Sequence, residues 1–199
     1  MPKILYSSTS PYSSKVRMAA KHAGIECDPV AVDASADPAA LLDSNPLGKI
    51  PVFVPDEGEA VYDSRAITQY LNRISGNRLF PRNAGKRTEA ERLEAQADGL
   101  CDCLLAHVME RRRPEAFIHQ PWLDRQWAKA ERLLDHLNAH PPKLPARIHA
   151  GHLALRATLG YLDLRFAGKW ERGRSKLVRW AKRFDAKFPE LTALVPQQT

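Results

Sequence analysis

Cysteine is scarce in this sequence. Only Cys27, Cys101 and Cys103 occur among 199 residues, and no two of them form a CxxC pair. Three cysteines cannot all pair within one chain, and two positions on a helix separated by one residue point to different sides. We therefore expect reduced, partly buried thiols and no disulfide framework. No histidine or carboxylate cluster has metal-ligand spacing either, so we expect no metal centre.

Long apolar runs are also lacking. No stretch approaches the roughly 20 apolar residues that a membrane span needs. The first ten residues, MPKILYSSTS, lack the apolar core and the small-residue cleavage site of a secretory signal. These absences predict a cytoplasmic protein with no membrane partner.

The charge is unevenly distributed along the chain. The formal net charge is +7, yet residues 1–80 carry eight basic and nine acidic side chains, and the remainder carries 22 and 14. Nine of the basic residues lie between Arg165 and Lys187. Such a segment can attract anions or nucleic acid. Because no nucleic-acid-binding motif accompanies it, we expect a solvated helix face and no nucleic-acid partner.

Residues 1–80 alternate between strand and helix patterns. In the segment 10–24, Ser10 can cap a helix, Pro11 suits its first position and Gly24 its end. The order predicts an α/β unit whose first two strands pair in parallel and whose last two form a hairpin. The patterns predict strands at 3–8, 27–33, 52–54 and 60–62, and helices at 10–24, 37–45 and 63–76.

Beyond Leu79 only helical patterns remain. Residues 80–85, FPRNAG, have the composition of a linker. Four apolar stripes at helical spacing follow, at 93–108, 123–137, 153–164 and 177–188. We therefore predict two domains, an α/β domain at residues 1–79 and an all-helical domain at residues 86–199.

The segment NPLGKIPVFV, residues 45–54, places Pro51 at the entrance of a predicted strand. Proline gives up a backbone donor there, so its presence needs a reason. A cis Ile50–Pro51 bond would turn the chain sharply and leave the backbone of Ile50 free. An extended peptide can pair with such a free strand edge.

Two predicted helix N-termini flank this edge, one at Ser10-Pro11 and one at Asp63-Ser64. The exposed N–H groups and the helix dipole favour anions at both. Ser64 can donate to a carboxylate and Asp63 can accept from an ammonium, which suits an α-amino acid group. Ser10 can donate to a thiolate. A ligand with an amino-acid end, an extended amide middle and a thiol describes glutathione.

Three segments in this order carry a family resemblance: SPYSSKVRMAAKHAGI, NPLGKIPVFV and VYDSRAITQYL. They resemble the N-terminal domain of the glutathione S-transferase superfamily, in its cytosolic, serine-type, bacterial-like form. LGYLDLRF, residues 159–166, resembles the central helix of the second domain. The resemblance covers essentially the whole chain. It implies a thioredoxin-like α/β N-terminal domain followed by an all-α helical domain, the glutathione S-transferase fold.

The resemblance implies that Ser10 is the catalytic serine, with Ser8 and Ser13 as alternatives. A free thiol with a pKa near 8.5 is mostly protonated at pH 7, and lowering that pKa by about two units takes roughly 2.7 kcal/mol. A hydrogen bond to a charged group supplies about 1.5–3 kcal/mol and a helix N-terminus about 0.3–1 kcal/mol. Ser10 would therefore activate the thiol without a general base. Taken alone, Ser10 is better interpreted as a plain N-cap, and it is the downstream segments NPLGKIP and Asp63-Ser64 that favour the catalytic role.

The resemblance also implies a glutathione-binding strip. Lys49 and Ile50 would hold the cysteinyl backbone and the glycine end, and Pro51 corresponds to the family's cis-proline. Asp63-Ser64 corresponds to the usual Glu-Ser pair, and the aspartate reaches one methylene less far. The competing interpretation of Lys49 is an exposed loop lysine, and that of Ser64 is a helix cap.

The helical half offers weaker candidates. Asp98 and Asp102 lie four apart on its first helix, and they either line the cleft, reach a neighbouring subunit's ligand or belong to a solvated face. Tyr161, Trp122 and His107 are candidates for the acceptor pocket, with core or surface positions as the competing interpretation. The resemblance implies a homodimer formed by this first helix and the 63–76 helix.

One feature departs from the family. Its members commonly have a Ser/Thr-x-x-Asp capping box before the central helix of the second domain. The corresponding segment here, IHAGHLALRATLGYL at residues 148–162, contains no such box. The sequence therefore leaves the start of this helix open.

The leading hypothesis is a detoxifying enzyme that joins glutathione, as co-substrate, to a small electrophile. Glutathione-dependent isomerisation or dehalogenation on the same fold remains an alternative. A further alternative is a non-catalytic binding module that uses its basic C-terminal helix for a protein or RNA partner. Thiol transferases and dehydroascorbate reductases are disfavoured, because those relatives have cysteine where Ser10 stands.

Overall fold

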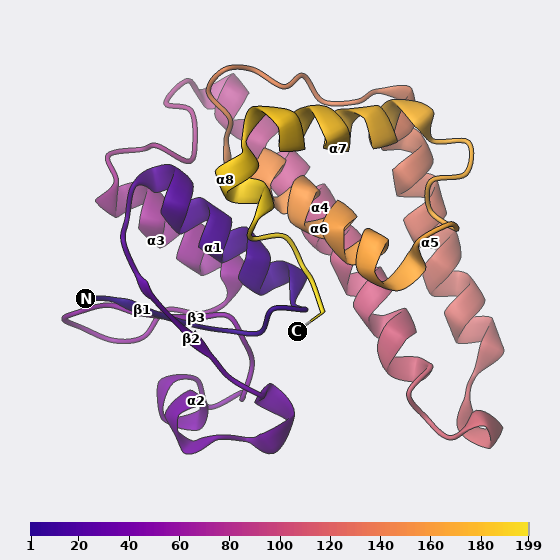
Figure 1. Cartoon of the computed structure of the whole chain (residues 1–199), viewed down its shortest axis with the longest axis horizontal. Helices are drawn as coiled ribbons and strands as arrows, with labels where there is room; N and C mark the ends of the chain where they lie inside the picture. The colour runs from indigo at the N-terminus through magenta and orange to yellow at the C-terminus, as the bar shows by residue number, and fades with distance from the viewer. Residues whose placement is uncertain (199) are drawn as a thin grey trace.

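The computed structural model describes residues 1–198 and places a small sheet with its helices beside a helical bundle (Figure 1). The predicted architecture, α/β first and all-helical second, is confirmed. The strands are β1 (Lys3–Tyr6), β2 (Asp28–Ala31) and β3 (Val52–Val54). The helices are α1 (Pro11–Ala23), α2 (Ala39–Ser44), α3 (Ser64–Ile74), α4 (Ala84–Glu110), α5 (Gln120–Ala139), α6 (Ala150–Phe166), α7 (Ser175–Lys187) and α8 (Pro189–Thr192), with short 3-10 turns at Ala34–Ala36 and Glu115–Phe117.

The sheet has the strand order β2-β1-β3. β1 pairs in parallel with β2, as predicted, and antiparallel with β3. The prediction of a full strand at 60–62 is wrong, because only Val61 forms a bridge, to Phe53. The chain enters α3 at Ser64, so the segment is too short for further pairing.

The two faces of the sheet follow the alternation of side chains along a strand. Ile4 and Phe53 belong to the main core, together with residues of α1 and α3. Leu5 and Val52 point to the opposite face, where Leu41 of α2 covers them. The sheet therefore lies between α1 and α3 on one side and α2 on the other (Figure 1).

α6 is the central helix of the second half. Most of its residues are buried on every side, which is typical of a helix enclosed by neighbours. Gly151 permits the close approach to α4, since a Cβ at this position would lie 2.6 Å from the carbonyl oxygen of Ala90. α1 packs against the same helix and so joins the α/β part to the bundle.

The start of α6 is stabilised by a histidine. The backbone N–H of His149, the N-cap residue, donates to Nδ1 of His152 at 3.2 Å. The other ring nitrogen, Nε2, lies 2.8 Å from the carbonyl oxygen of Lys143 and therefore carries the proton. His152 thus provides the N3 acceptor of a capping box. Burial lowers the pKa of His152, which favours this neutral ring.

None of the helices formed by residues 1–198 is long and apolar enough to cross a membrane.

Cys27, Cys101 and Cys103 are all free thiols. Cys101 is enclosed between α4 and α6, where burial raises its thiol pKa to about 12. Such a thiol stays protonated at neutral pH, which makes it a poor nucleophile.

Candidate active site

Strand register brings three distant segments to one end of the sheet. Leu5 pairs with Val52, so the next step along the antiparallel ladder places Tyr6 level with Pro51. Phe53 pairs antiparallel with Val61, so Asp63, two residues further on, lies toward the end of the sheet where β3 begins. The loop after β1, the entrance of β3 and the start of α3 therefore lie toward the same end of the sheet.

Ser10 caps α1 at this edge. Its Oγ accepts from the backbone N–H of Ser13 at 3.2 Å, and its backbone has the extended conformation of an N-cap. Capping uses a lone pair of the hydroxyl and leaves the O–H free to donate. The side chain is partly exposed. The predicted cap and the predicted donor role are therefore compatible in one residue.

The two alternative serines have different surroundings. Ser13 is completely buried, with its Oγ facing the backbone N–H of Ser7 at 3.5 Å. Ser8 lies in the loop before α1, where its carbonyl accepts from the N–H of Gln197 at 3.1 Å. Ser10 is the partly exposed hydroxyl at the helix end itself, whereas Ser13 is closed off from solvent.

The loop before β3 is held by Asn45, which sequence reasoning missed. Its side-chain amide donates to the carbonyl of Lys49 at 2.8 Å and accepts from the N–H of Leu47 at 3.1 Å. Asn45 is 2% exposed, so these bonds are shielded from water. The asparagine preceding a Pro-x-Gly sequence was the available signal, because asparagine side chains commonly bind their own loop backbone.

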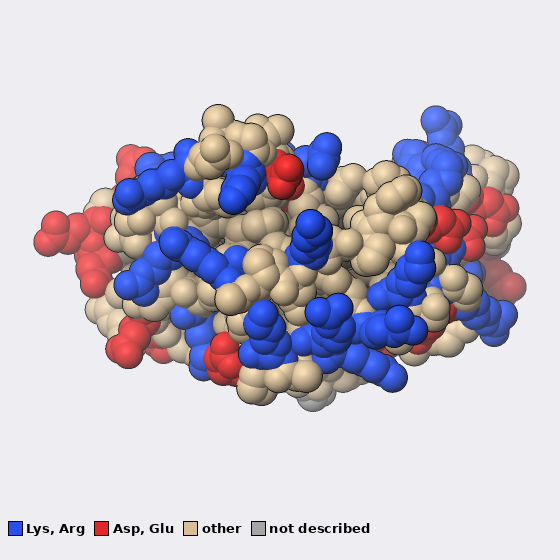
Figure 2. All heavy atoms as spheres, turned by 90° about the horizontal axis from the view of Figure 1, so that it is seen from above, with Lys and Arg blue, Asp and Glu red and all other residues tan. Residues whose placement is uncertain are grey.

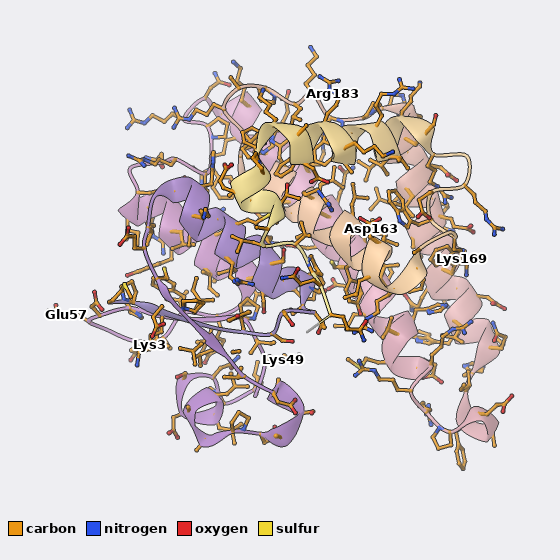
Figure 3. The ribbon with its side chains drawn as sticks, viewed as in Figure 1. Lys3, Lys49, Glu57, Asp163, Lys169 and Arg183 are labelled. Atoms are coloured by element: carbon orange, nitrogen blue, oxygen red, sulfur yellow. The ribbon has the colours of Figure 1, made fainter. Side chains whose placement is uncertain are left out.

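Beyond that loop, the Ile50–Pro51 peptide bond is cis. Ile50 is half-buried and Pro51 is buried, whereas Lys49 is exposed and extends from the loop between α2 and β3 (Figure 3). β3 pairs with β1 on one side and makes only the Phe53–Val61 bridge on the other. The backbone of Ile50 therefore lies beyond the paired part of the sheet.

Asp63 caps α3. Its Oδ1 accepts from the N–H groups of Arg65 at 3.0 Å and Ala66 at 3.3 Å. The carboxylate is exposed, and Oδ2 makes none of these bonds. Ser64 follows as the first helical residue and is 5% exposed. The first N–H groups of a helix have no acceptor within it, so this end is suited to an anion.

The carboxylates of α4 reach back to the α/β part. Asp98 is 8% exposed and forms an ion pair with Lys15 of α1, whose Nζ lies 2.8 Å from Oδ1. Asp102 accepts from the hydroxyl of Tyr12. Burial raises the pKa of Tyr12, which keeps this donor protonated. The solvated-face interpretation is therefore wrong for Asp98, and both carboxylates link α4 to α1.

The C-terminal segment crosses the start of α1. The carbonyl of Leu194 accepts from Ser14 Oγ at 2.7 Å, in addition to the Gln197–Ser8 contact. The segment also packs on α6 at Gly160, where a Cβ would lie 2.9 Å from Pro196. Residues nearly a chain length apart in sequence thus support the loop that carries Ser10.

The three acceptor-pocket candidates do not form one site. Tyr161 and His107 are 3% and 4% exposed, and Trp122 is 41% exposed. His107 lines a cavity of about 320 Å³ at the ends of α4 and α6, together with Arg165 and Lys169. The competing interpretation of core and surface positions describes these residues better.

The sequence predicted no metal centre, and the side chains that could hold a metal ion bear on this prediction. Within residues 1–198, no group of three or more histidine, cysteine, aspartate or glutamate side chains is arranged to hold a metal ion. The polar groups at the sheet edge are hydroxyls, backbone N–H groups and the carboxylate of Asp63. They are suited to hydrogen bonds with an organic ligand.

The chain is similar to a known family and to known proteins. Residues 5–78 match the family described as "Glutathione S-transferase, N-terminal domain". The "Uncharacterized GST-like protein YibF" of Escherichia coli (strain K12) is 31% identical over 183 residues, 89% of this chain and 90% of that protein.

Solved structures extend the similarity over the whole fold. A glutathione S-transferase from Methylobacillus flagellatus KT, solved with GSH bound, has a TM-score of 0.90 and 35% identity, covering 99% of this chain and 100% of the other. A glutathione transferase family member from Pseudomonas fluorescens Pf-5, with bound glutathione, has a TM-score of 0.88 and 30% identity, covering both chains completely. The α/β part is thus thioredoxin-like, and the helical part matches as well.

Proposed function

The chain belongs to the glutathione S-transferase family, and from this premise we propose that it binds glutathione and activates the thiol for attack on a small electrophile. The observation that carries the proposal is the position of Ser10. It caps α1 with a lone pair, keeps its O–H free, and follows the loop at the end of the sheet where β3 begins and from which the chain enters α3.

We assign the ligand's parts to this edge. The free oxygen of Asp63 accepts from the ammonium of the γ-glutamyl group, and the start of α3 at Ser64 donates to its carboxylate. The backbone of Ile50 pairs with the cysteinyl residue, which Pro51 allows at this strand entrance. Lys49 is exposed beside the strip and attracts the glycine carboxylate.

The chemical step begins with loss of the thiol proton to solvent. The Ser10 hydroxyl then donates to the thiolate, and the N-terminal dipole of α1 adds to the stabilisation. Together these contribute about 2–4 kcal/mol, enough to lower the thiol pKa by about 1.5–3 units. The thiolate sulfur forms a bond to the electrophilic atom, whose leaving group or π-electron pair takes the displaced electrons. Serine stays uncharged throughout.

The test combines calorimetry of glutathione binding with thiolate absorbance followed against pH. The wild type should bind glutathione and ionise its thiol near neutral pH. Ser10→Ala should bind with similar affinity and ionise near the ordinary thiol pKa of about 8.5. Ser8→Ala is the matched control and should behave as the wild type. Thiol ionisation that is the same in Ser10→Ala and in the wild type would refute the role of Ser10.

We also propose a homodimer in which α3 and α4 form the interface. Ile74 at the end of α3 is a 52% exposed apolar side chain that such an interface would cover. Light scattering during gel filtration should give twice the mass of one chain. A mass equal to a single chain at micromolar concentration would refute the dimer.

A further inference from the structure

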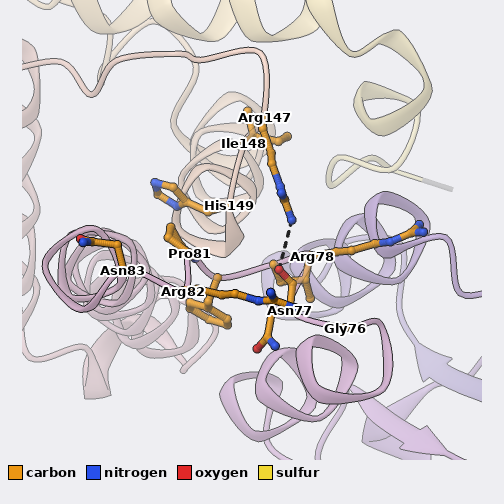
Figure 4. A pocket seen from close by; sticks show the side chains of 11 residues that line it. Gly76, Asn77, Arg78, Pro81, Arg82, Asn83, Arg147, Ile148 and His149 are labelled. Carbon is orange, nitrogen blue, oxygen red and sulfur yellow. Dashed lines mark hydrogen bonds between the residues drawn. The ribbon is translucent and has the colours of Figure 1, made fainter.

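A cavity of about 520 Å³ lies where the two parts of the chain join (Figure 4). It is lined by residues 76–83, which lead from α3 to α4, and by residues 147–149, which lead into α6. Its size lies within the range of roughly 300–1,000 Å³ that is typical of small-molecule sites. Nothing in the proposed glutathione reaction uses these residues.

This cavity is separate from the edge that carries Ser10. Arg78, one of its lining residues, donates through Nη1 to the carbonyl of Ala23 at the C-terminal end of α1, at 3.1 Å. Ser10 caps the opposite end of this 13-residue helix. At 1.5 Å per residue the two ends lie about 20 Å apart. A ligand here would not overlap with glutathione.

The lining carries three arginines whose charge is not neutralised nearby. Within residues 1–198, none of Arg78, Arg82 and Arg147 has a carboxylate within ion-pair distance, and no acidic residue lines the cavity. Arg147 donates through Nη2 to the carbonyl of Asn77 at 3.2 Å. Figure 4 shows Arg82 extending toward Asn77 as well, so two guanidinium groups approach one region from different walls.

Two helix N-termini add to this positive potential. Asn83 is the N-cap of α4 and His149 is the N-cap of α6, and both line the cavity. The positive ends of both helix dipoles therefore face the cavity that Arg82 and Arg147 line. Oriented backbone dipoles strengthen anion binding where cationic side chains already gather.

The surrounding surface extends the same potential. The exposed side chains of α7 include five basic residues and no acidic one, and the face seen from above carries many lysines and arginines (Figure 2). Such a field raises the local concentration of anions. The basic residues are Lys176, Arg179, Lys182, Arg183 and Lys187.

We propose that this cavity binds the phosphate or diphosphate group of a small molecule, independently of glutathione. The guanidinium fork matches phosphate oxygens in bidentate geometry. The two guanidinium groups that approach Asn77, those of Arg82 and Arg147, favour an anion that carries more than one negative charge, which a diphosphate supplies and a single carboxylate does not. Inorganic diphosphate and nucleoside diphosphates share this chemistry.

The experiment is calorimetry of the full chain with inorganic pyrophosphate, and in parallel with ADP and citrate, at low ionic strength. Arg82→Gln and Arg147→Gln should each weaken pyrophosphate binding about tenfold, the loss of one charge-assisted contact of about 1.4 kcal/mol. Arg179→Gln on α7 removes the same charge from an exposed position and should change the affinity less than about twofold. Thermal unfolding verifies that each variant is folded. Arg82 makes no described hydrogen bond, so Arg82→Gln still tests the proposal if Arg147→Gln fails to fold.

Several results would overturn the proposal. These are no saturable binding by the wild type, equal losses in Arg179→Gln and the cavity variants, or citrate binding as tightly as pyrophosphate. Equal losses would indicate a general effect of the basic face, and duplex DNA binding with the same pattern would assign that face to nucleic acid instead. Tighter binding of ADP than of pyrophosphate would identify a nucleotide as the ligand. Saturating glutathione should leave the pyrophosphate affinity unchanged. If the chain failed to bind glutathione, the pyrophosphate titration would still test the cavity by itself.

Discussion

Lys15 Nζ lies 2.8 Å from Asp98 Oδ1 in the interface between α1 and α4, where the lysine side chain is 1% exposed. Glu94 lies 3.4 Å from the same ammonium and also accepts from the hydroxyl of Thr68. One buried cation thus pairs with two carboxylates, and Arg65 of α3 adds a second partner for Asp98 at 3.5 Å. The ionic cluster joins the α/β part to the helical part.

Removing that cation should be strongly destabilising. Lys15→Met keeps much of the side chain's volume but leaves the carboxylate of Glu94 buried without its ion-pair partner, and leaves Asp98 with Arg65 alone, whose Nη2 lies 3.5 Å from Oδ2. The expected loss is about 3–5 kcal/mol of unfolding free energy, measured by urea denaturation. Lys21→Met, on the exposed side of the same helix, should cost less than about 0.5 kcal/mol. A loss below about 1 kcal/mol in Lys15→Met would contradict the importance of this pair.

A substitution at Asp63 can separate the capping role of this side chain from the role of its negative charge. Asparagine caps helices about as well as aspartate, so Asp63→Asn should leave the stability of the protein nearly unchanged. Loss of the negative charge should weaken glutathione binding about tenfold, because an ammonium–carboxylate hydrogen bond is replaced by a weaker one. Calorimetry measures the affinity. Asp33→Asn, at another exposed aspartate cap, should bind glutathione like the wild type. Unchanged affinity in Asp63→Asn would exclude the proposed ammonium contact.

Asn45 should act on glutathione binding without touching the ligand. Asn45→Ala removes the bonds that hold Leu47 and Lys49, so hydrogen exchange at the Leu47 amide should accelerate strongly. We expect about 1–3 kcal/mol of lost stability and weaker glutathione binding from the loosened strip. Asn138→Ala, which removes a similar pair of bonds at the start of α7, should lose stability but keep the affinity. Unchanged hydrogen exchange at the Leu47 amide would show that the side chain of Asn45 does not hold this loop in place.

The histidines at the start of α6 should make the protein acid-sensitive. Burial lowers the pKa of His149 to about 3 and also lowers that of His152, whereas the unfolded chain protonates both near pH 6.5. The unfolded state therefore binds more protons below that pH, and stability falls as the pH drops toward 3. His149 contributes a slope of about 1.4 kcal/mol per pH unit in this window, and the lowered pKa of His152 adds to the decline in the same direction.

His152→Gln isolates that effect. Glutamine at N3 can still accept from the N-cap backbone but does not titrate. Urea denaturation between pH 7 and pH 4 should therefore show a flatter decline than in the wild type. His136→Gln, at an exposed position of α5, should leave the decline unchanged. Parallel curves for His152→Gln and the wild type would show that His152 does not titrate between the two states.

The sequence predicted the helix caps and apolar helix faces correctly, because these features depend on nearby residues. The caps at Ser10 and Asp63 and the four apolar stripes depend on neighbours within a few residues, and all appear in the structure. The pairing of β1 with β3 and the bridge from Phe53 to Val61 follow from the predicted order of strands. These features make the candidate site visible in the sequence.

Long-range contacts were not visible in the same way. Lys15 lies in a segment with an ordinary amphipathic pattern, and only the approach of α4 makes it a buried cation. His152 caps α6 because its other nitrogen finds the carbonyl of Lys143, and that tautomer depends on tertiary structure. The hairpin at 60–62 was overestimated, since strand propensity does not reveal how soon α3 begins.

The contact between Gln197 and Ser8 sets an order of events during synthesis. The loop that carries Ser10 leaves the ribosome among the first segments, yet its carbonyl at Ser8 and the hydroxyl of Ser14 find their partners only in residues 194–197. A nascent α/β domain can form its sheet and helices early, because those contacts are internal to it. The loop before α1 and the first turn of α1 acquire these two hydrogen bonds only after residues 194–197 have been translated.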